Sequence, residues 1–278
     1  MNTTDLNISS QNILNTTTPS NPSLNNILST EYKELCYEIV NRHFNFYCLS
    51  FQNPERSKSM KERFENIGLE LNIFEGVPIT DKRIADNEIR HTSDAVKRLW
   101  SVTYGHLTNI RNFYYSNKEF GVFCENDVLV NKNLPFFLPD IMSEFKTMNL
   151  DLLLLGYMCT FKLEEWMQGY SLKHEFKDRP YKYLNYPNHQ WGIHGLMLDK
   201  KGARLILETF WNRANEYIGH ESNFSPDWTI TKVGNRALIT PMFIVENGED
   251  NMEHYKDVTQ HQFHLNTWKF NHIPDVFI

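Results

Sequence analysis

The rest of the chain is arranged around the segment Phe120-Gly-Val-Phe-Cys-Glu-Asn-Asp-Val-Leu-Val130. Apolar residues lie on both sides of the step Glu125-Asn126-Asp127, which predicts a buried strand that reaches the surface at two carboxylates and then returns to the core. Ionised carboxylates beside a core are costly unless they are paired, hydrogen-bonded or bound to a metal. Divalent cations that carry substrate phosphates are one common solution, although acidic turns of this kind also occur by chance on protein surfaces.

The segments around this stretch predict alternating strands and helices. Strand Phe44–Ser50 is followed by Asn53-Pro54-Glu55, which has the residues of a helix start. A second strand is expected over Leu71–Phe74, and a long helix with an apolar stripe over Ser93–Ser116. The run Leu152–Leu155 predicts a central buried strand. This order of elements indicates an α/β sheet with parallel neighbours.

The second half of the chain has weaker signals. We expect a helix over Pro139–Met148, a strand over Trp191–Leu198 followed by a helix capped by Asp199, and a late strand over Leu238–Val245. Ser225-Pro226-Asp227-Trp228 has the residues of another helix start. Asp227 would then lie near the positive end of that helix, which favours its ionised form. A fixed carboxylate there could accept a proton, or it could be only a helix cap.

Phe161–Pro187 is irregular and rich in aromatic residues. Long irregular segments inside compact domains are often binding loops. We therefore expect a substrate-side loop here, with Trp166, Tyr170 and Tyr183 as possible stacking surfaces. The alternative is that these rings fill the core beneath the loop.

Composition limits the class of protein. The chain has 278 residues, of which 41% are hydrophobic and 14% aromatic, as in a packed globular protein. Residues 1–30 are rich in Asn, Ser and Thr and predict a flexible tail, while 31–278 predict a single domain. A formal net charge of -6 argues against a nucleic-acid partner, because phosphate-backbone binders need a basic face.

The cysteines and the apolar runs indicate the cellular compartment. Cys36, Cys48, Cys124 and Cys159 show no metal-binding spacing, and we interpret them as reduced core residues. The first residues lack a signal-like pattern, and no run approaches the ~20 apolar residues of a membrane span. We therefore expect a cytoplasmic protein without a membrane span, of a cell or of a virus acting in its host's cytoplasm.

Histidines add candidates for metal binding. His106 follows Gly105 in the long predicted helix, where a buried histidine satisfied by a neighbour is the simpler interpretation. The C-terminal segment carries His254, His261, His264 and His272. We assign His261 as the candidate metal ligand, although the sequence itself gives no reason to prefer it over the other three.

Taken together, these motifs resemble glycosyltransferase family 25, the lipooligosaccharide and collagen galactosyltransferases, over roughly Phe44 to Asn251. The resemblance rests on several motifs that share the family's order along the chain. They are Leu49–Arg63, Val102–Arg111, Phe123–Val128, Leu152–Gly156, His194–Leu207 and Ser225-Pro226-Asp227. The chain departs from the family pattern at Asn126, where the family usually has an aspartate.

The resemblance implies a GT-A fold, a nucleotide-binding mixed sheet flanked by helices with an acceptor-side loop region. It implies transfer of galactose or glucose from a UDP-sugar, with Mn²⁺ or Mg²⁺, to a glycan or to a glycosylated or hydroxylated protein. We expect Asp227 to be the base of an inverting displacement and Glu125, Asp127 and His261 to be metal ligands. The expected donor-binding residues are Ser50, Asn53, Arg56, His106, Glu125 and Asn126.

Two other functions remain open from the sequence. Asn126 is compatible with a non-catalytic descendant that binds a nucleotide sugar or glycan without transferring it. A metal-dependent nucleotidyltransferase could use the same acidic strand end, but it would normally carry a glycine-rich or basic phosphate loop near the first strand. Ser50–Lys61 contains no glycine, which makes this third function the least favoured.

Overall fold

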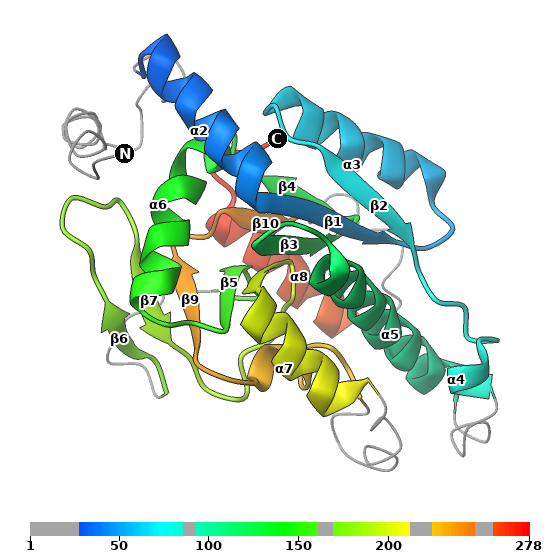
Figure 1. Ribbon diagram of the computed structural model, residues 1–278. Helices are drawn as coiled ribbons and strands as arrows, with labels where there is room; N and C mark the ends of the chain where they lie inside the picture. Colours follow the sequence, from blue (N-terminus) through cyan, green and yellow to red (C-terminus); the bar gives the residue numbers. More distant parts are fainter. Residues whose placement is uncertain (1–27, 86–92, 161–168, 212–223, 248–257) are drawn as a thin grey trace.

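A computed structural model describes residues 28–85, 93–160, 169–211, 224–247 and 258–278 (Figure 1). Its central feature is an eight-stranded mixed sheet with the strand order β2-β1-β3-β8-β5-β9-β7-β6. These strands are β1 (Phe44–Ser50), β2 (Leu71–Glu75), β3 (Phe120–Glu125), β5 (Leu152–Gly156), β6 (Ser171–His174), β7 (Lys182–Asn185), β8 (Gly195–Asp199) and β9 (Arg236–Thr240). The predicted α/β class, with a mixed sheet flanked by helices, is confirmed.

Helices cover both faces of this sheet. They are α2 (Thr30–His43), α3 (Pro54–Asn66), α4 (Lys82–Ala85), α5 (Asp94–Tyr115), α6 (Leu134–Thr147), α7 (Lys200–Phe210), the 3₁₀ helix η5 (Ile230–Lys232) and α8 (Val258–Asn271). Figure 1 shows α5 and α7 on one side of the sheet and α2, α3 and α6 on the other. The long helix expected over Ser93–Ser116 is α5, with the Ser93 side chain accepting a hydrogen bond from the Val96 N–H.

The strand β5 shows how one short sequence supports both layers of the core. Its side chains alternate between the two faces of the sheet. Leu152 and Leu154 pack in the cluster that contains the buried residues of α5 and α7, while Leu153 and Leu155 pack in the cluster that contains those of α3 and α6. All four are fully buried, which explains why the run Leu152–Leu155 is continuously apolar.

The amino-terminal half of the sheet is parallel. β1 pairs in parallel with both β2 and β3, and Leu49 lies opposite Glu125 in the β1–β3 register. The predicted strand-helix-strand opening is therefore confirmed. Because parallel strands end at the same edge, Ser50 of β1 and Glu125 of β3 lie at the edge where open α/β sheets usually bind ligands.

The acidic step separates two strands, as expected. β3 ends at Glu125, and β4 (Val128–Val130) begins after Asp127. β4 does not rejoin the main sheet but pairs antiparallel with β10 (Ile244–Glu246), where Glu246 lies opposite Val128. The chain therefore returns to the core after Asp127. The same strand pairing brings Glu246 close to Glu125 and Asp127.

The helix expected over Pro139–Met148 starts earlier. α6 begins at Leu134, carries Pro135 in its first turn and has Pro139 in its interior. An interior proline normally breaks a helix because it lacks the N–H that bonds to the residue four positions earlier. Here Leu134, Phe136 and other apolar residues of the first turns are buried, so tertiary packing outweighs the local cost.

Several boundaries in the second half of the chain were predicted wrongly. The strand expected over Trp191–Leu198 begins only at Gly195, because Gly192 has a φ of +94° that an extended strand does not allow. The late strand over Leu238–Val245 is two strands, β9 and β10. Phe161–Pro187 contains the short strands β6 and β7, whose four residues each are too few to show a periodicity.

Two expectations about the cysteines and the membrane can be compared directly with the structure. All four cysteines are buried and none forms a disulfide bond, as predicted. Within the described ranges, no helix is long and apolar enough to cross a bilayer. The predicted tail lies almost entirely outside these ranges, which begin at Leu28.

Candidate functional site

A cavity of about 950 Å³ lies where the acidic step meets the carboxyl-terminal segments of the chain. Four carboxylates line it: Glu125, Asp127, Asp227 and Glu246. We call it the carboxylate cavity. Its other walls come from α5, from the residues after β5, before β6, before β8 and before η5, and from α8. The lining residues are Leu99, Val102, Met158, Cys159, Tyr170, His189, Gln190, Trp191, Gly192, Ile193, His194, Pro226, Phe263 and His264.

Glu125 is the last residue of β3 and is held by a histidine. His106 Nε2 of α5 lies 3.1 Å from Glu125 Oε1, and the imidazole is fully buried. Burial opposes ionisation of Glu125, but the hydrogen bond to His106 and the charge interactions with His106, His194 and His264 together outweigh it, so the pKa of Glu125 is lowered. The expectation of a buried histidine satisfied by a neighbour is confirmed for Nε2, whose partner Glu125 is the candidate metal ligand, whereas His106 Nδ1 is buried without a hydrogen-bond partner among the described residues.

Asp127 has the opposite electrostatic setting. Burial, together with the negative charges of Glu125 and Glu246, raises the pKa of Asp127 to about 6. Arg56 is the nearby cation, with its Nη1 4.0 Å from Asp127 Oδ2. The backbone N–H of Asn247 donates to the Asp127 carbonyl oxygen over 2.7 Å, which fixes the turn. The cavity therefore concentrates negative charge around Asp127.

The predicted donor-binding residues are only partly brought together. The Asn126 amide donates to Ser50 Oγ over 2.8 Å, which links the acidic step to the end of β1. Arg56 extends from α3 to Asp127. Asn53, in contrast, caps α3 by accepting a hydrogen bond from the Arg56 N–H, so the structure gives its side chain a structural role.

Asp227 lines the same cavity but is not at a helix N-terminus. The expected helix after Ser225 is a turn followed by the three-residue helix η5, so the prediction that a helix dipole favours ionised Asp227 is wrong. Its Oδ1 accepts a hydrogen bond from the Gly192 N–H over 2.7 Å. Burial and the charge of Glu125 raise the pKa of Asp227 above its usual 3.8.

Sequence reasoning missed Glu246 as a site residue. Its side chain is only 2% exposed, and both carboxylate oxygens lie 2.6 Å from His264 Nδ1. His194 Nε2 lies 3.6 Å from Glu246 Oε2. The available signal was an acid directly after the apolar run Phe243–Val245, which repeats the pattern that singled out Glu125.

The structure describes the side chain of one C-terminal histidine, His264, in the cavity. His264 lies in α8 and points at Glu246 in the cavity. His261 is also in α8, but its side chain lies outside the described part of the chain. The structure therefore places His264 in the cavity and leaves the assignment of His261 as a prediction.

The residues present fit a divalent cation held jointly with a substrate. No group of three or more His, Cys, Asp or Glu side chains in the described ranges has the arrangement of a complete metal site. Mg²⁺ and similar hard cations are, however, often held by one or two carboxylates plus substrate phosphates and waters. Glu125 and Asp127 supply that pair, and a cation would relieve the repulsion that raises the pKa of Asp127.

The three predicted stacking residues have different outcomes: Tyr170 lines the carboxylate cavity, whereas Tyr183 does not. Tyr183 is fully buried and donates to Glu144 Oε2, so the alternative of a core ring holds for it. Tyr170 is 8% exposed and donates to Gln190 Oε1 in the cavity wall. Trp166 lies outside the described residues.

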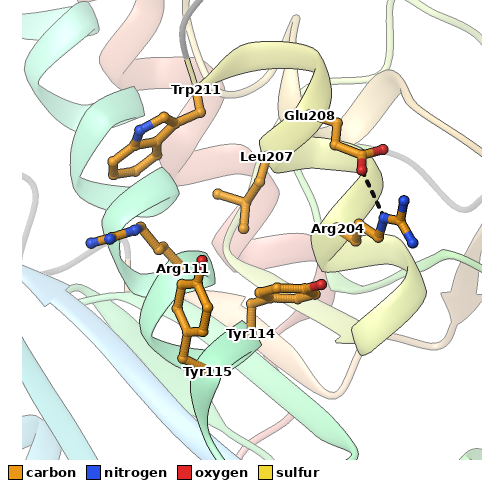
Figure 2. Close-up of a pocket in the computed structure, with 7 residues that line it drawn as sticks. All are labelled: Arg111, Tyr114, Tyr115, Arg204, Leu207, Glu208 and Trp211. Carbon is orange, nitrogen blue, oxygen red and sulfur yellow. Dashed lines mark hydrogen bonds and ion pairs between the residues drawn. The ribbon is translucent and has the colours of Figure 1, made fainter.

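A second hollow, of about 530 Å³, lies between α5 and α7 (Figure 2). We call it the α5–α7 groove; its lining residues are Arg111, Tyr114, Tyr115, Arg204, Leu207, Glu208 and Trp211. Figure 2 shows Arg111 between Trp211 and Tyr115, with its guanidinium carbon 5.3 Å and 5.5 Å from the two ring centres. None of these lining residues was predicted as a site residue from the sequence.

Comparison with known proteins adds no further constraint. No protein-family model matches this chain, and no curated protein matches its sequence.

Proposed function

We propose that this protein is a metal-assisted glycosyltransferase of the family 25 type, with a GT-A-like arrangement of its α/β sheet. It moves a hexose, galactose or glucose, from a UDP-sugar to a hydroxyl of a glycan or of a glycosylated or hydroxylated protein. The observation that carries this proposal is the convergence of Glu125, Asp127, Asp227 and Glu246 on one cavity. Gathering four carboxylates in one cavity, with side-chain exposures of 2% for Glu246, 15% for Asp127 and 32% for Glu125, is costly, and a role in binding a cation and a polar substrate would explain that cost.

The donor would bind between the ends of β1 and β3. Arg56 lies 4.0 Å from Asp127, and the Asn126 amide is hydrogen-bonded to Ser50 at the end of β1; a guanidinium is suited to diphosphate oxygens. A divalent cation held by Glu125 and Asp127 would neutralise the charge that develops on the departing diphosphate. His106 would keep Glu125 ionised and correctly oriented for that task.

The acceptor would be activated by Asp227. Its carboxylate takes the proton from the acceptor hydroxyl while that oxygen forms a bond to the anomeric carbon of the hexose. The bond between the anomeric carbon and the diphosphate breaks on the opposite face, and its electron pair leaves with UDP. The raised pKa of Asp227 makes it a stronger base than an ordinary carboxylate. This displacement inverts the anomeric configuration.

The second candidate is a nucleotide-sugar or glycan-binding protein without transfer activity. The observation that favours it is the Asn126 side chain, which is directed to Ser50 and leaves two carboxylates at the acidic step. A donor screen separates the two functions. Hydrolysis of UDP-glucose, UDP-galactose and UDP-N-acetylglucosamine is measured with and without Mn²⁺, and calorimetry measures UDP binding.

We expect slow, Mn²⁺-dependent hydrolysis of at least one UDP-hexose. UDP binding without hydrolysis of any donor, and without transfer to a panel of glycans, would favour the binding protein. Absence of both UDP binding and Mn²⁺ binding would contradict both candidates.

A further inference from the structure

Three large aromatic side chains gather at the carboxylate cavity while remaining exposed. Trp191 is 46% exposed, Trp228 37% and Phe263 38%. The ring centre of Trp191 lies 6.0 Å from that of Trp228 and 6.3 Å from that of Phe263. Trp191 and Phe263 line the cavity. Clustered exposed rings of this kind usually mark a binding surface, because leaving them in water is unfavourable.

The three rings are tilted relative to one another, and the ammonium group of Lys232 lies 5.9 Å from the ring centre of Trp228. The planes of Trp191 and Trp228 are inclined by 67°, and those of Trp191 and Phe263 by 56°. Neither pair is stacked face to face, so the rings do not cover one another completely. They come from the segment before β8, from the turn before η5 and from α8, so the fold, and not one local sequence, assembles this surface.

Hydrogen bonds hold the backbone beneath Trp191 in place. Its carbonyl oxygen accepts from the Met158 N–H over 2.9 Å and from the Gln190 side chain over 2.6 Å. Trp228 lies in a turn closed by the hydrogen bond from its N–H to the Ser225 carbonyl over 3.2 Å. Both rings are therefore presented on fixed backbone, which lowers the entropic cost of binding a ligand.

A hydrogen bond that joins the two tryptophan segments involves the proposed base. Asp227 precedes Trp228, Gly192 follows Trp191, and the Gly192 N–H donates to Asp227 Oδ1 over 2.7 Å. A ligand resting on the two indoles therefore lies next to a carboxylate that can accept a hydrogen bond from one of its hydroxyls. The rings and the carboxylate form a single recognition unit.

We propose that Trp191, Trp228 and Phe263 form an aromatic platform that binds a neutral hexopyranose as the acceptor, with a hydroxyl directed to Asp227. This inference deepens the proposed function and rests on it for the acceptor role. A pyranose has one apolar face of C–H groups and a rim of hydroxyls, which matches aromatic faces beside hydrogen-bond acceptors. The lining carboxylates, Glu125, Asp227 and Glu246 among them, repel anionic sugars.

The platform is tested by sugar binding without donor or metal. The chain has six tryptophans, and two-dimensional NMR separates their indole N–H signals, which substitution to Phe assigns. Methyl β-galactopyranoside and methyl β-glucopyranoside are titrated into the full chain. We expect the signals of Trp191 and Trp228 to shift and that of Trp211, in the α5–α7 groove, to stay unchanged. Methyl β-glucuronide, an anion, should bind at least about tenfold more weakly.

Tryptophan variants test which ring binds the hexoside. Trp191→Ala should weaken binding of the neutral hexoside by about tenfold, the loss expected for a good aromatic contact, while Trp191→Phe should lose less. Trp211→Ala is the matched control and should bind as wild type. Thermal melting confirms that each variant is folded.

Other outcomes overturn the platform. If uridine or N-acetyl-phenylalaninamide shifts the Trp191 and Trp228 signals at lower concentrations than the hexosides, the surface binds the donor base or a peptide. Absence of hexoside binding in a protein that still hydrolyses UDP-hexose rejects the platform and leaves the transferase. Hexoside binding without any donor hydrolysis keeps the platform as a sugar site and rejects the transferase.

Discussion

Helix α5 contributes to both the carboxylate cavity and the α5–α7 groove, but an ion pair of the groove is exposed, whereas two carboxylates of the cavity are largely buried. In the groove, Arg204 and Glu208 form an ion pair over 2.7 Å with side chains 65% and 60% exposed. In the cavity, the Glu246 side chain is 2% exposed and that of Asp127 15%. An exposed ion pair changes the free energy of folding very little, whereas removing a carboxylate from water lowers the stability of the folded protein. The energetic cost of its charges, and not the presence of a hollow, is therefore the reason to choose the carboxylate cavity as the candidate functional site.

The largest difference between the cavity and the groove is expected in enzyme turnover when one carboxylate in each region is replaced by its amide. Asp127→Asn should reduce turnover of UDP-hexose by about 1,000-fold or more, because a metal that bridges the diphosphate contributes several kcal/mol to the transition state. Mn²⁺ binding, measured by electron paramagnetic resonance, should be lost. The melting temperature at neutral pH should not fall, since burial already disfavours the charge of Asp127.

Glu208→Gln in the groove is the matched control and should keep wild-type turnover and Mn²⁺ binding. Full turnover by Asp127→Asn would contradict the assignment of the cavity as the metal site.

The next largest effect concerns the base. Asp227→Asn should lower kcat for transfer by about 100-fold or more, with the acceptor KM little changed, because the amide oxygen can still accept the Gly192 hydrogen bond. Only the ionised carboxylate takes a proton, and its pKa is raised above 3.8. Wild-type kcat should therefore fall as the pH drops through that raised pKa. The kcat of the Asp227→Asn variant should not show this fall at low pH. A normal kcat with only KM altered would reassign Asp227 to binding.

A smaller effect is expected from backbone geometry in the cavity wall. A Cβ on Gly192 would lie 2.4 Å from the Met158 nitrogen, and its φ is +94°. Gly192→Ala should therefore lower the free energy of unfolding by at least about 1–3 kcal/mol, measured by urea denaturation. Gly76→Ala is the control, because there the nearest atom is 3.1 Å away on the exposed side chain of Phe51. Equal effects would mean that the Gly192 segment is not rigid.

The smallest effect is expected from the exposed pair of the groove. Arg204→Gln should change the free energy of unfolding by no more than about 0.5 kcal/mol, and raising the salt concentration should reduce the difference further. Urea denaturation at low and high salt measures it. A loss of several kcal/mol would show that the groove, like the cavity, depends on its charges.

Local patterns predicted much of the sheet. The opening strands, α5 and β5 follow from apolar periodicity, a helix cap and a continuous apolar run, which are properties of neighbouring residues. The acidic step was located for the same reason, since an interruption of an apolar run is visible along the chain. Asp199 as the cap of α7 is confirmed by its hydrogen bond from the Gly202 N–H.

Predictions failed where distant contacts decide the local structure. The start of α6 depends on burial of its first turns despite Pro139. The Ser225 segment has the residues of a helix start, yet it forms a turn whose Asp227 is engaged with Gly192. Neither partner lies in the sequence window that a periodicity or a cap motif covers.

By itself, the sequence determined that this protein is an α/β protein with reduced core cysteines and two carboxylates at the end of a buried strand. Only the tertiary structure decided which residues join them. Glu246, His264 and the pair Trp191 and Trp228 come from segments far from Glu125 along the chain. Strand pairing and helix packing bring such segments together, and burial then sets the energy of each charge, so neither can be calculated from neighbouring residues alone.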